Sequence, residues 1–252
     1  MMKHFSPKDL EHGCLEFLFS RGTGDEVVRL WGHHLSNRVI ILSYIRRTSM
    51  IAKHLPPRAS VLDWGAGRGH MTYLLAKFGL SPTHYDVTKS GNTLSEELGL
   101  PEVIGDHPEK VQLPDESFDA VLSSGTLEHV NDIPSSIREI RRVLKPGGLF
   151  FIFNFPHRYS PSEFIARKFL GSTYHPILWS LPHLEKMLSL ENFRILKSGY
   201  ENAIPMNLSG PVAWMRPVYN LCPRFLLSID ALMTRMPGMN LMSNSVWAIG
   251  KK

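Results

Sequence analysis

The chain has 252 residues, of which 43% are hydrophobic and 20% are charged, so it can bury a core and is neither disordered nor fibrous. This length allows one large α/β domain with additions or two small domains, and we favour one domain. The net charge is +5, but the basic residues are scattered and form no long run or basic–aromatic pattern. We therefore expect no nucleic-acid partner.

The cysteines and the N-terminus bear on the cellular compartment. Cys14 and Cys222 lie near opposite ends of the chain without metal-ligand spacing, which favours reduced thiols in a reducing compartment. The N-terminal residues are not followed by the apolar region of a secretory signal, and no apolar run is long enough to span a bilayer. We expect a cytoplasmic protein, with membrane association at the cytoplasmic face left open.

The first part of the chain is predicted to be helical. Residues 25–54 carry apolar positions at helical spacing, and this run ends at Pro56-Pro57. We expect one or two amphipathic helices there. We accordingly assign residues 1–57 to a helical extension and residues 58–252 to the main domain.

From Ala59 onward, short apolar segments alternate with helical ones, which predicts a mostly parallel sheet covered by helices on both faces. We expect the first helix to end at Gly79, and a later one to be stopped by Pro146-Gly147-Gly148. The predicted strands are residues 60–64, 83–87, 103–104, 118–123 and 149–153. Of the helices between them, the first ends at residue 78, and the later ones cover residues 94–98 and 134–144.

The pattern breaks after Phe155 into a segment rich in proline, histidine and tyrosine. It resumes with a helix that has Ser180 as its cap and Pro182 in its first turn. Two last strands are predicted at residues 193–201 and 245–250. The residues between these strands, 203–242, are rich in methionine, proline and leucine without a clear period, and we assign them to an insertion.

The strongest chemical feature is the turn from Asp63 to Gly69, where an apolar strand ends in an acid and glycines alternate before a helix. Glycine permits a positive φ and a close approach of backbone to a ligand, and a helix N-terminus offers free N–H groups. The spacing is not the GxGxxG of dinucleotide-binding proteins, since His70 or Thr72 stands in the last glycine position. No Gly-Lys-Ser/Thr follows, as a P-loop requires. Alone, the turn is also compatible with a purely structural role.

Two further acids follow neighbouring predicted strands. Asp86 ends the second strand and Asp106 follows the third, and the carboxyl ends of adjacent strands in an open α/β sheet line one crevice. A carboxylate at Asp86 can accept both hydroxyls of a ribose. Asp106 can accept a hydrogen bond from the exocyclic amine of an adenine, while a neighbouring backbone N–H donates to a ring nitrogen. Each acid alone is more often a cap or turn residue, but together with the glycine turn they predict a nucleoside site.

With these residues the sequence resembles the class I S-adenosylmethionine-dependent methyltransferases, over about residues 59–155. The resemblance implies a Rossmann-like seven-stranded sheet with an antiparallel last strand, and S-adenosyl-L-methionine as methyl donor. It also implies that Leu127 lies near the adenine. The stretches that carry it are 61–69, Asp86, 105–106, 113–119 and 142–148. The residues predicted to contact the donor are Asp63, Gly65, Ala66, Gly67, Gly69, Asp86, Val87, Asp106, His107, Ser123 and Ser124.

The stretch 124–130 is similar to the corresponding one in ubiquinone-pathway O-methyltransferases and other methyltransferases of type 11. Their pattern can carry a further acid before the Leu-Glu-His sequence. Here Gly125 and Thr126 occupy that stretch, so the acid that could take part in binding a divalent metal is missing. We therefore predict no metal site.

His129 is the candidate general base, because an imidazole titrates near neutral pH and can take a proton from a substrate hydroxyl. Alternatively, Glu128 and His129 only brace the loop, and no base is required, since an in-line methyl transfer gains mainly from alignment. Four residues follow the fifth strand, where this fold holds its acceptor, and are predicted to bind substrate unless they only pack the loop. They are His157, Tyr159, His175 and Trp179.

The predicted reaction is O-methylation of a small or lipid-linked hydroxylated acceptor, such as a quinone precursor or a sugar. The Asn/Asp-Pro-Pro-Tyr/Phe signature is absent after the fourth strand, where residues 123–125 read Ser-Ser-Gly, which argues against methylation of nucleic-acid bases. N- or C-methylation and a non-catalytic, donor-binding regulatory protein on the same scaffold remain alternatives.

The insertion suggests a further partner. Residues 211–236 mix apolar and aromatic residues with three arginines, a composition that can dock on a membrane surface or hold a lipid-linked acceptor. The alternative is a helical cover packed on the sheet. We favour the cover, because Pro217 and Pro223 interrupt any long amphipathic face.

Overall fold

The computed structural model describes residues 7–21, 34–89, 93–169, 175–208 and 210–252. Seven strands form one sheet in the order β3-β2-β1-β4-β5-β7-β6. The strands β1 to β5 are parallel, and β7 runs antiparallel to both of its neighbours. The predicted sheet, with its antiparallel last strand, is confirmed.

The elements follow the predicted rhythm closely. The strands are β1 (Ser60–Trp64), β2 (Ser81–Asp86), β3 (Glu102–Ile104), β4 (Phe118–Ser124), β5 (Leu144–Pro156), β6 (Arg194–Glu201) and β7 (Ser245–Lys251). The helices are α1 (Pro7–Arg21), α3 (Arg38–His54), α4 (His70–Lys77), α5 (Leu94–Glu97), α6 (Ile133–Val143), α7 (Pro161–Phe169), α8 (Leu181–Leu190), α9 (Arg216–Leu221) and α10 (Pro223–Met233). Short 3₁₀ turns are η1 (Leu127–His129), η2 (Gly210–Met215) and η3 (Asn240–Met242).

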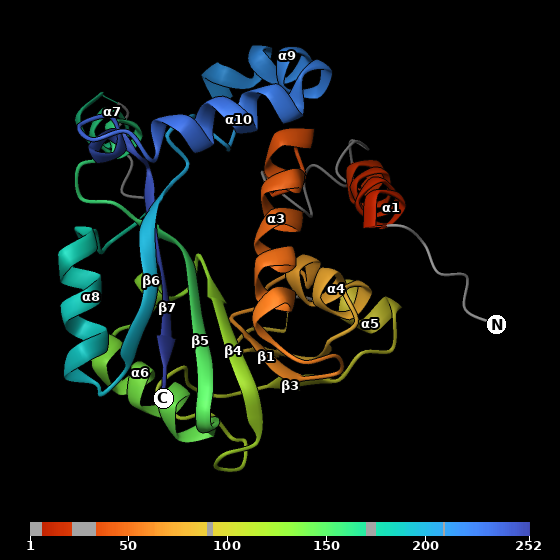
Figure 1. Ribbon diagram of the computed structural model, residues 1–252, viewed down its shortest axis with the longest axis vertical. Helices are drawn as coiled ribbons and strands as arrows, with labels where there is room; N and C mark the ends of the chain where they lie inside the picture. The colour runs from red at the N-terminus through yellow and green to blue at the C-terminus, as the bar shows by residue number, and fades with distance from the viewer. Residues whose placement is uncertain (1–6, 22–33, 90–92, 170–174, 209) are drawn as a thin grey trace.

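Helices cover both faces of the sheet, with α6 and α8 on one face and α1, α3 and α4 on the other (Figure 1). Because successive side chains of a strand point to opposite faces, each face has its own apolar core. The core on the α3 face includes Ile41, Leu74 and Phe151, and the core on the α6 face includes Trp64, Ile137 and Leu184.

The N-terminal helices belong to the same core as the sheet. The side chain of Asn37 caps α3 by accepting from the N–H of Ile40, and the helix ends before Leu55, as the prolines predict. Residues 25–33 of the predicted helical run lie outside the described residues. The helix α1 was not predicted, and its Leu18 is fully buried in the core that α3 and β1 share. The extension is therefore packed as part of the main body.

Two elements differ from the prediction. β5 begins at Leu144 because that residue pairs with Phe118, and a register shift then brings Leu149 opposite Ala120, so the Pro-Gly-Gly stretch lies within the strand. Helix α7 lies in the segment expected to be irregular. Its first turn is capped by Ser160, whose Oγ accepts from the N–H of Glu163 at 3.2 Å.

The stretches 113–119 and 142–148 brace the sheet at the end where β1 and β4 begin. Asp119 accepts from Lys145 Nζ at 2.6 Å and from the N–H of Ser60 at 2.8 Å, which joins β4, β5 and β1. The guanidinium of Arg142 donates to the carbonyl oxygen of Leu113 at 2.9 Å. These stretches are thus structural, at the opposite end of β1 from the glycine turn.

The insertion is helical, but its helices lie mainly against α3. The N–H of Arg38 donates to Asn220 Oδ1 at 2.9 Å, and Arg46 donates to the carbonyl oxygen of Leu227 at 3.3 Å. Helices α9 and α10 lie beyond the end of the sheet toward which β4 and β5 point (Figure 1). The insertion is therefore helical, and its packing against α3 corrects the expected packing on the sheet.

Replacing the buried Ile41 of α3 tests whether the extension and the sheet share one core. We expect Ile41→Ala to lower the free energy of unfolding by about 2–5 kcal/mol, because it leaves a cavity between helix and sheet. Urea unfolding followed by circular dichroism and by tryptophan fluorescence should show one shifted transition. Ile165→Ala, at an exposed position, is the control and should change little. Two separate transitions would contradict a shared core.

Candidate active site

The glycine turn is tied to the end of β2. The N–H groups of Gly65 and Ala66 both donate to the carbonyl oxygen of Tyr85, at 2.8 and 3.1 Å. Gly65 has φ 76°, and a Cβ there would stand 2.0 Å from Cγ2 of Thr126. Gly67 has φ 56°, but a Cβ there would meet no atom within 4 Å. At Gly65 the turn therefore packs against the loop after β4, whereas at Gly67 its backbone is open to a ligand.

Asp86 faces this opening from the end of β2. Its Oδ2 accepts from the N–H of Gly67 at 2.8 Å, and its Oδ1 accepts from the N–H of Thr88 at 2.9 Å. Since a carboxylate oxygen has two lone pairs, each oxygen keeps one for a ligand hydroxyl. The predicted ribose contact stays a prediction, and the geometry leaves room for it.

Asp63 lies under the turn and is fully buried. Burial raises its pKa to about 7, although the hydrogen bond from Thr72 Oγ1, at 2.6 Å, lowers it and the charge of Asp86 raises it further. The carboxyl group therefore changes charge near neutral pH. A positively charged ligand group nearby would favour its ionised form.

Asp106 and His107 follow β3, beside the end of β2, where Asp86 pairs with Ile104. Both side chains are exposed, and Asp106 Oδ2 accepts from Gln112 Nε2 at 2.6 Å. Val87, directly after Asp86, is also exposed. The structure thus places the predicted nucleoside residues along neighbouring strand ends, and the predicted adenine contact of Asp106 remains untested.

Ser123 and Ser124 end β4, next to the turn. Ser123 is buried, and its Oγ has no hydrogen-bond partner among the described residues. Ser124 Oγ accepts from Asn154 Nδ2 at 3.3 Å. Asn154, on β5, has φ 58°, a conformation that asparagine tolerates better than most residues. The ends of β4 and β5 are therefore joined by polar side chains.

A buried polar network that sequence reasoning missed supports Asn154. Glu201, at the end of β6, accepts from the N–H of Asn154 and from Arg47 Nε, the latter at 3.0 Å. Asn202 donates to Asn154 Oδ1 at 2.8 Å and accepts from Arg47 Nη2 at 3.1 Å. Burial raises the pKa of Glu201, although the charge of Arg47 opposes this. An arginine on the buried face of α3 was the signal available in the sequence.

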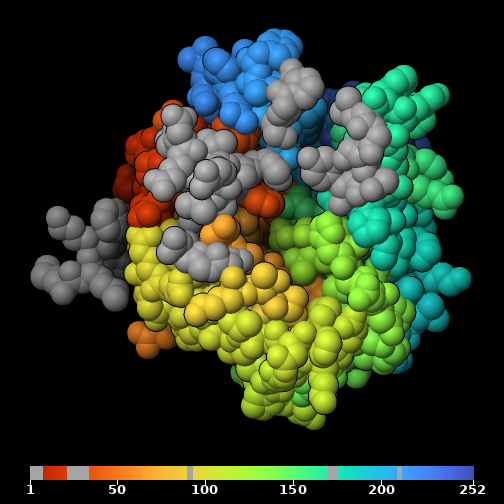
Figure 2. Space-filling view, turned by 180° about the vertical axis from the view of Figure 1, so that it is seen from behind, coloured from red at the N-terminus to blue at the C-terminus, as the bar shows by residue number. Residues whose placement is uncertain are grey.

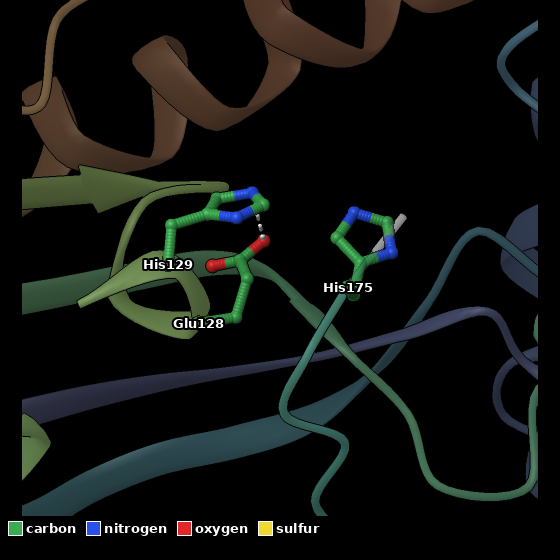
Figure 3. Close-up of side chains that lie close together, drawn as sticks. All are labelled: Glu128, His129 and His175. Atoms are coloured by element: carbon green, nitrogen blue, oxygen red, sulfur yellow. Dashed lines mark ion pairs between the residues drawn. The ribbon is translucent and has the colours of Figure 1, made fainter. Parts of the chain in front are cut away.

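His129 lies on η1, just beyond β4, with its side chain half exposed (Figure 3). Its Nε2 is 3.9 Å from Oε1 of Glu128, and its ring centroid is 5.6 Å from that of His175. Burial and the charge of His175 lower the pKa of His129. The imidazole is therefore neutral, and able to accept a proton, at neutral pH.

His175 reaches this place from the segment before α8 and is held by α7. Its Nδ1 lies 2.5 Å from Oε1 of Glu163. Burial lowers the pKa of His175, but the hydrogen bond and charge of Glu163 and the charge of Glu128 outweigh burial and raise it. For Glu163, burial raises the pKa, and the contacts with His175 and Arg167 outweigh it and lower it. The contact therefore favours the protonated form of His175 and the ionised form of Glu163.

Glu128 is buried, and its carboxylate lies beside His129 (Figure 3). Burial raises its pKa to about 7, and its Oε2 has no partner among the described residues. One ligand atom from each of Glu128, His129 and His175 lies within 4.8 Å of the other two. Two imidazoles and a carboxylate are ligands of divalent transition metals, so this group has metal-binding chemistry that the sequence did not predict.

The other predicted acceptor residues lie elsewhere in the same loop region. His157 is buried, its Nδ1 lies 3.1 Å from the carbonyl oxygen of Ser243, and burial lowers its pKa. Trp179 stacks on Phe155, with ring centroids 4.8 Å apart, and Tyr159 is exposed. Of the four candidates, His175 is the one that contacts His129. The roles of the others remain predictions.

Known proteins resemble the part of the chain that forms this site. Residues 62–152 match the family model described as a methyltransferase domain. Together with the sheet order and the strand-end site, this match confirms the resemblance seen in the sequence. The region 62–152, which contains the glycine turn, is therefore similar to known methyltransferase domains.

The similar proteins include enzymes named for quinone pathways. A demethylmenaquinone methyltransferase of Tropheryma whipplei (strain Twist) is 31% identical over 137 residues, 51% of this chain and 52% of that protein. A ubiquinone biosynthesis O-methyltransferase of Methylobacterium nodulans is 34% identical over 124 residues, 44% of this chain and 49% of that one. The chain thus spans about half the length of the curated relatives it matches.

The fold extends beyond the matched region. A crystal structure from Thermotoga maritima, described as a SAM-dependent methyltransferase and possible histamine N-methyltransferase, covers 94% of this chain with 99% of its own. The TM-score is 0.61 and the sequence identity 18%, so the likeness concerns the fold. The helical additions on both sides of residues 62–152 are part of that overlap.

The buried Asp63 predicts an unusual pH dependence of stability. Its pKa is raised in the folded state from 3.8 to about 7, so its contribution is complete below the ordinary pKa and is lost as the pH rises through about 7. We expect Asp63→Asn to gain stability relative to the native protein between these pH values. Urea unfolding at a series of pH values measures the difference.

Asp132 provides a control of opposite sign. This exposed acid caps α6, and its hydrogen bonds with Ser135 lower its pKa. Its contribution is complete above its ordinary pKa and is lost as the pH falls below that value, so Asp132→Asn should lose stability relative to the native protein as the pH rises toward the ordinary pKa, with a constant difference above it. Parallel profiles for the native protein and Asp63→Asn would contradict the raised pKa of Asp63.

Proposed function

We propose that the protein transfers a methyl group from S-adenosyl-L-methionine to a hydroxyl group of a small or lipid-linked acceptor. The observation that carries this proposal is the contact between Gly67 and Asp86, which sets an open stretch of backbone beside a carboxylate at the ends of β1 and β2. A nucleoside needs both: backbone N–H groups that it can approach, and an acceptor for its ribose hydroxyls.

The remaining donor contacts follow from this placement. Asp106 and His107 stand where the adenine would extend beyond β2 and β3, while Asp63, Ser123 and Ser124 stand where the methionine end would lie. The unpartnered Oγ of buried Ser123 supports this arrangement, because a buried hydroxyl is ordinarily hydrogen-bonded. The donor's positive sulfonium supplies an activated methyl group.

The acceptor hydroxyl is proposed to bind beside His129, beyond the end of β4. His129 takes up the hydroxyl proton at Nε2 as the oxygen forms its new bond to the methyl carbon and the carbon–sulfur bond breaks. The imidazolium formed there lies 3.9 Å from Glu128 Oε1, and the ionised form of Glu128 stabilises it. Alignment of the two reactants supplies most of the rate, and the base adds to it.

The relatives named for ubiquinone and menaquinone pathways support a hydroxylated aromatic acceptor for this protein. We further propose that it works in the cytoplasm, since Cys14 and Cys222 are both unpaired. Incubation with donor labelled in its methyl group and an extract of the source organism identifies the acceptor. A product methylated on nitrogen or carbon would show that the reaction is N- or C-methylation and not O-methylation.

Donor binding is tested by calorimetric titration with S-adenosyl-L-methionine. We expect Asp86→Ala to weaken binding by at least about tenfold, because a hydrogen bond to a charged group contributes about 1.5–3 kcal/mol. Gly67→Val should abolish it, since a branched side chain would fill the open stretch and disfavour φ 56°. Asp115→Ala, on the loop that Arg142 braces, is the control. Equal binding by all four proteins would end the proposal.

The role of His129 is tested with the acceptor found above. His129→Asn should lower kcat by about 10²–10⁴-fold while donor binding is unchanged, because general-base catalysis contributes a factor of that order. Normal kcat in this variant would show that alignment alone suffices.

The charge of His175 should appear in the pH profile. Because it lowers the pKa of His129, His175→Gln should raise that pKa and move the acid limb of kcat/KM to higher pH. The matched control is His183→Gln, at a histidine that stacks on Trp179, and it should leave the acid limb in place.

Activity lost on chelation and restored by Mn²⁺ would instead place a cation among Glu128, His129 and His175.

A further inference from the structure

Exposed apolar side chains gather on α7, η2, α9, α10 and η3, which we call the apolar end surface. Trp214 is 74% exposed, Leu221 82%, Phe225 66% and Phe169 68%. Soluble proteins rarely expose such large contiguous apolar patches without a partner. The surface lies at the end of the molecule toward which β4 and β5 point (Figure 1), and the blue atoms of the insertion form the top of the space-filling view (Figure 2).

The parts of this surface are joined by hydrogen bonds. Ser160 and Ser162, at the start of α7, both donate to Asn244 Oδ1, at 2.8 and 2.6 Å. Asn244 follows η3, and the N–H of Asn240 in η3 donates to the carbonyl oxygen of Met236, just beyond α10, at 3.0 Å. The surface is thus a continuous structure built from two segments far apart in the sequence.

The charges on these two segments are of one sign at the surface. Residues 156–182 and 203–243 contain six arginines and lysines but two acids, Glu163 and Asp230, and both acids are buried. Lys168 lies over the rings of Phe164 and Phe169, at 5.3 and 5.8 Å from their centroids. Aromatic and aliphatic side chains among cations are typical of a surface that meets anionic lipid headgroups.

The helices of the surface are suited to lie on a bilayer rather than to cross it. Pro217 and Pro223 divide the insertion into the short helices α9 and α10. Among the described residues, every helix lacks the length and hydrophobicity that crossing would require. A second copy of the chain is a poorer match for this surface. The two segments offer no exposed acid that could pair with the cations of the same segments in the other copy.

We propose that the apolar end surface binds the anionic face of a lipid bilayer. Its apolar side chains enter the boundary between headgroups and acyl chains, and its exposed cations Arg158, Lys168 and Arg235 meet the lipid phosphates. The membrane contact stands apart from the proposed function. Its consequence, that the acceptor is lipid-linked and enters the site from the bilayer, rests on the proposed function.

Vesicle co-sedimentation tests the contact, with phosphatidylcholine vesicles and with phosphatidylcholine mixed with phosphatidylglycerol. We expect the native protein to bind the anionic vesicles and to be released by salt, because surface charges are screened. The double variant Trp214→Ser, Phe225→Ser should bind at least about tenfold more weakly, since buried apolar area sets interfacial affinity. Leu190→Ser, at a comparably exposed position on α8, is the matched control and should bind normally.

Three results would overturn the proposal. They are absence of binding by the native protein at low salt, equal binding by the double variant, and a native dimer that the double variant converts to a monomer. Sedimentation velocity detects the last of these, which would assign the surface to a second copy of the chain. Donor titration on the same preparations separates the two proposals, because the double variant should bind S-adenosyl-L-methionine normally.

Discussion

The connection between the ends of β1 and β2 is the constraint on which the site depends. The carbonyl oxygen of Tyr85 holds the first part of the glycine turn, and the carboxylate of Asp86 holds Gly67. This arrangement requires parallel strands in register, which in turn requires a packed helix on each face of the sheet. The buried α3 and α4 supply one of those layers, so a donor site at the strand ends is a product of the whole core.

Much of the fold followed from the sequence because its signals are local. Apolar runs bounded by glycine or proline define β1 and β4, and Ser180 marks the start of α8. The donor residues could be placed because the ends of neighbouring parallel strands share one edge of the sheet. The start of β5 was wrong, since it depends on a pairing between Phe118 and Leu144 that no local pattern reveals.

The missed parts of the site arise from contacts between distant segments. Arg47 and Glu201 are separated by 154 positions, so neither segment alone reveals that the two residues pair. Helix α7 did carry a local signal, a serine followed three residues later by a glutamate, but a proline- and histidine-rich context obscured it. Glu163 of that helix then determines the charge of His175. Tertiary structure thus decides which of several histidines becomes chemically distinct.

Helix α7 has two faces with different tasks. Outward, it carries Phe164 and Phe169; inward, its Glu163 favours the protonated form of His175, whose charge, together with burial, lowers the pKa of His129. The position of this one helix therefore contributes, through His175, to the proton affinity of His129, which it does not itself contact. Any partner that displaces α7 adjusts that affinity, so the surface and the proposed proton acceptor form a single electrostatic unit.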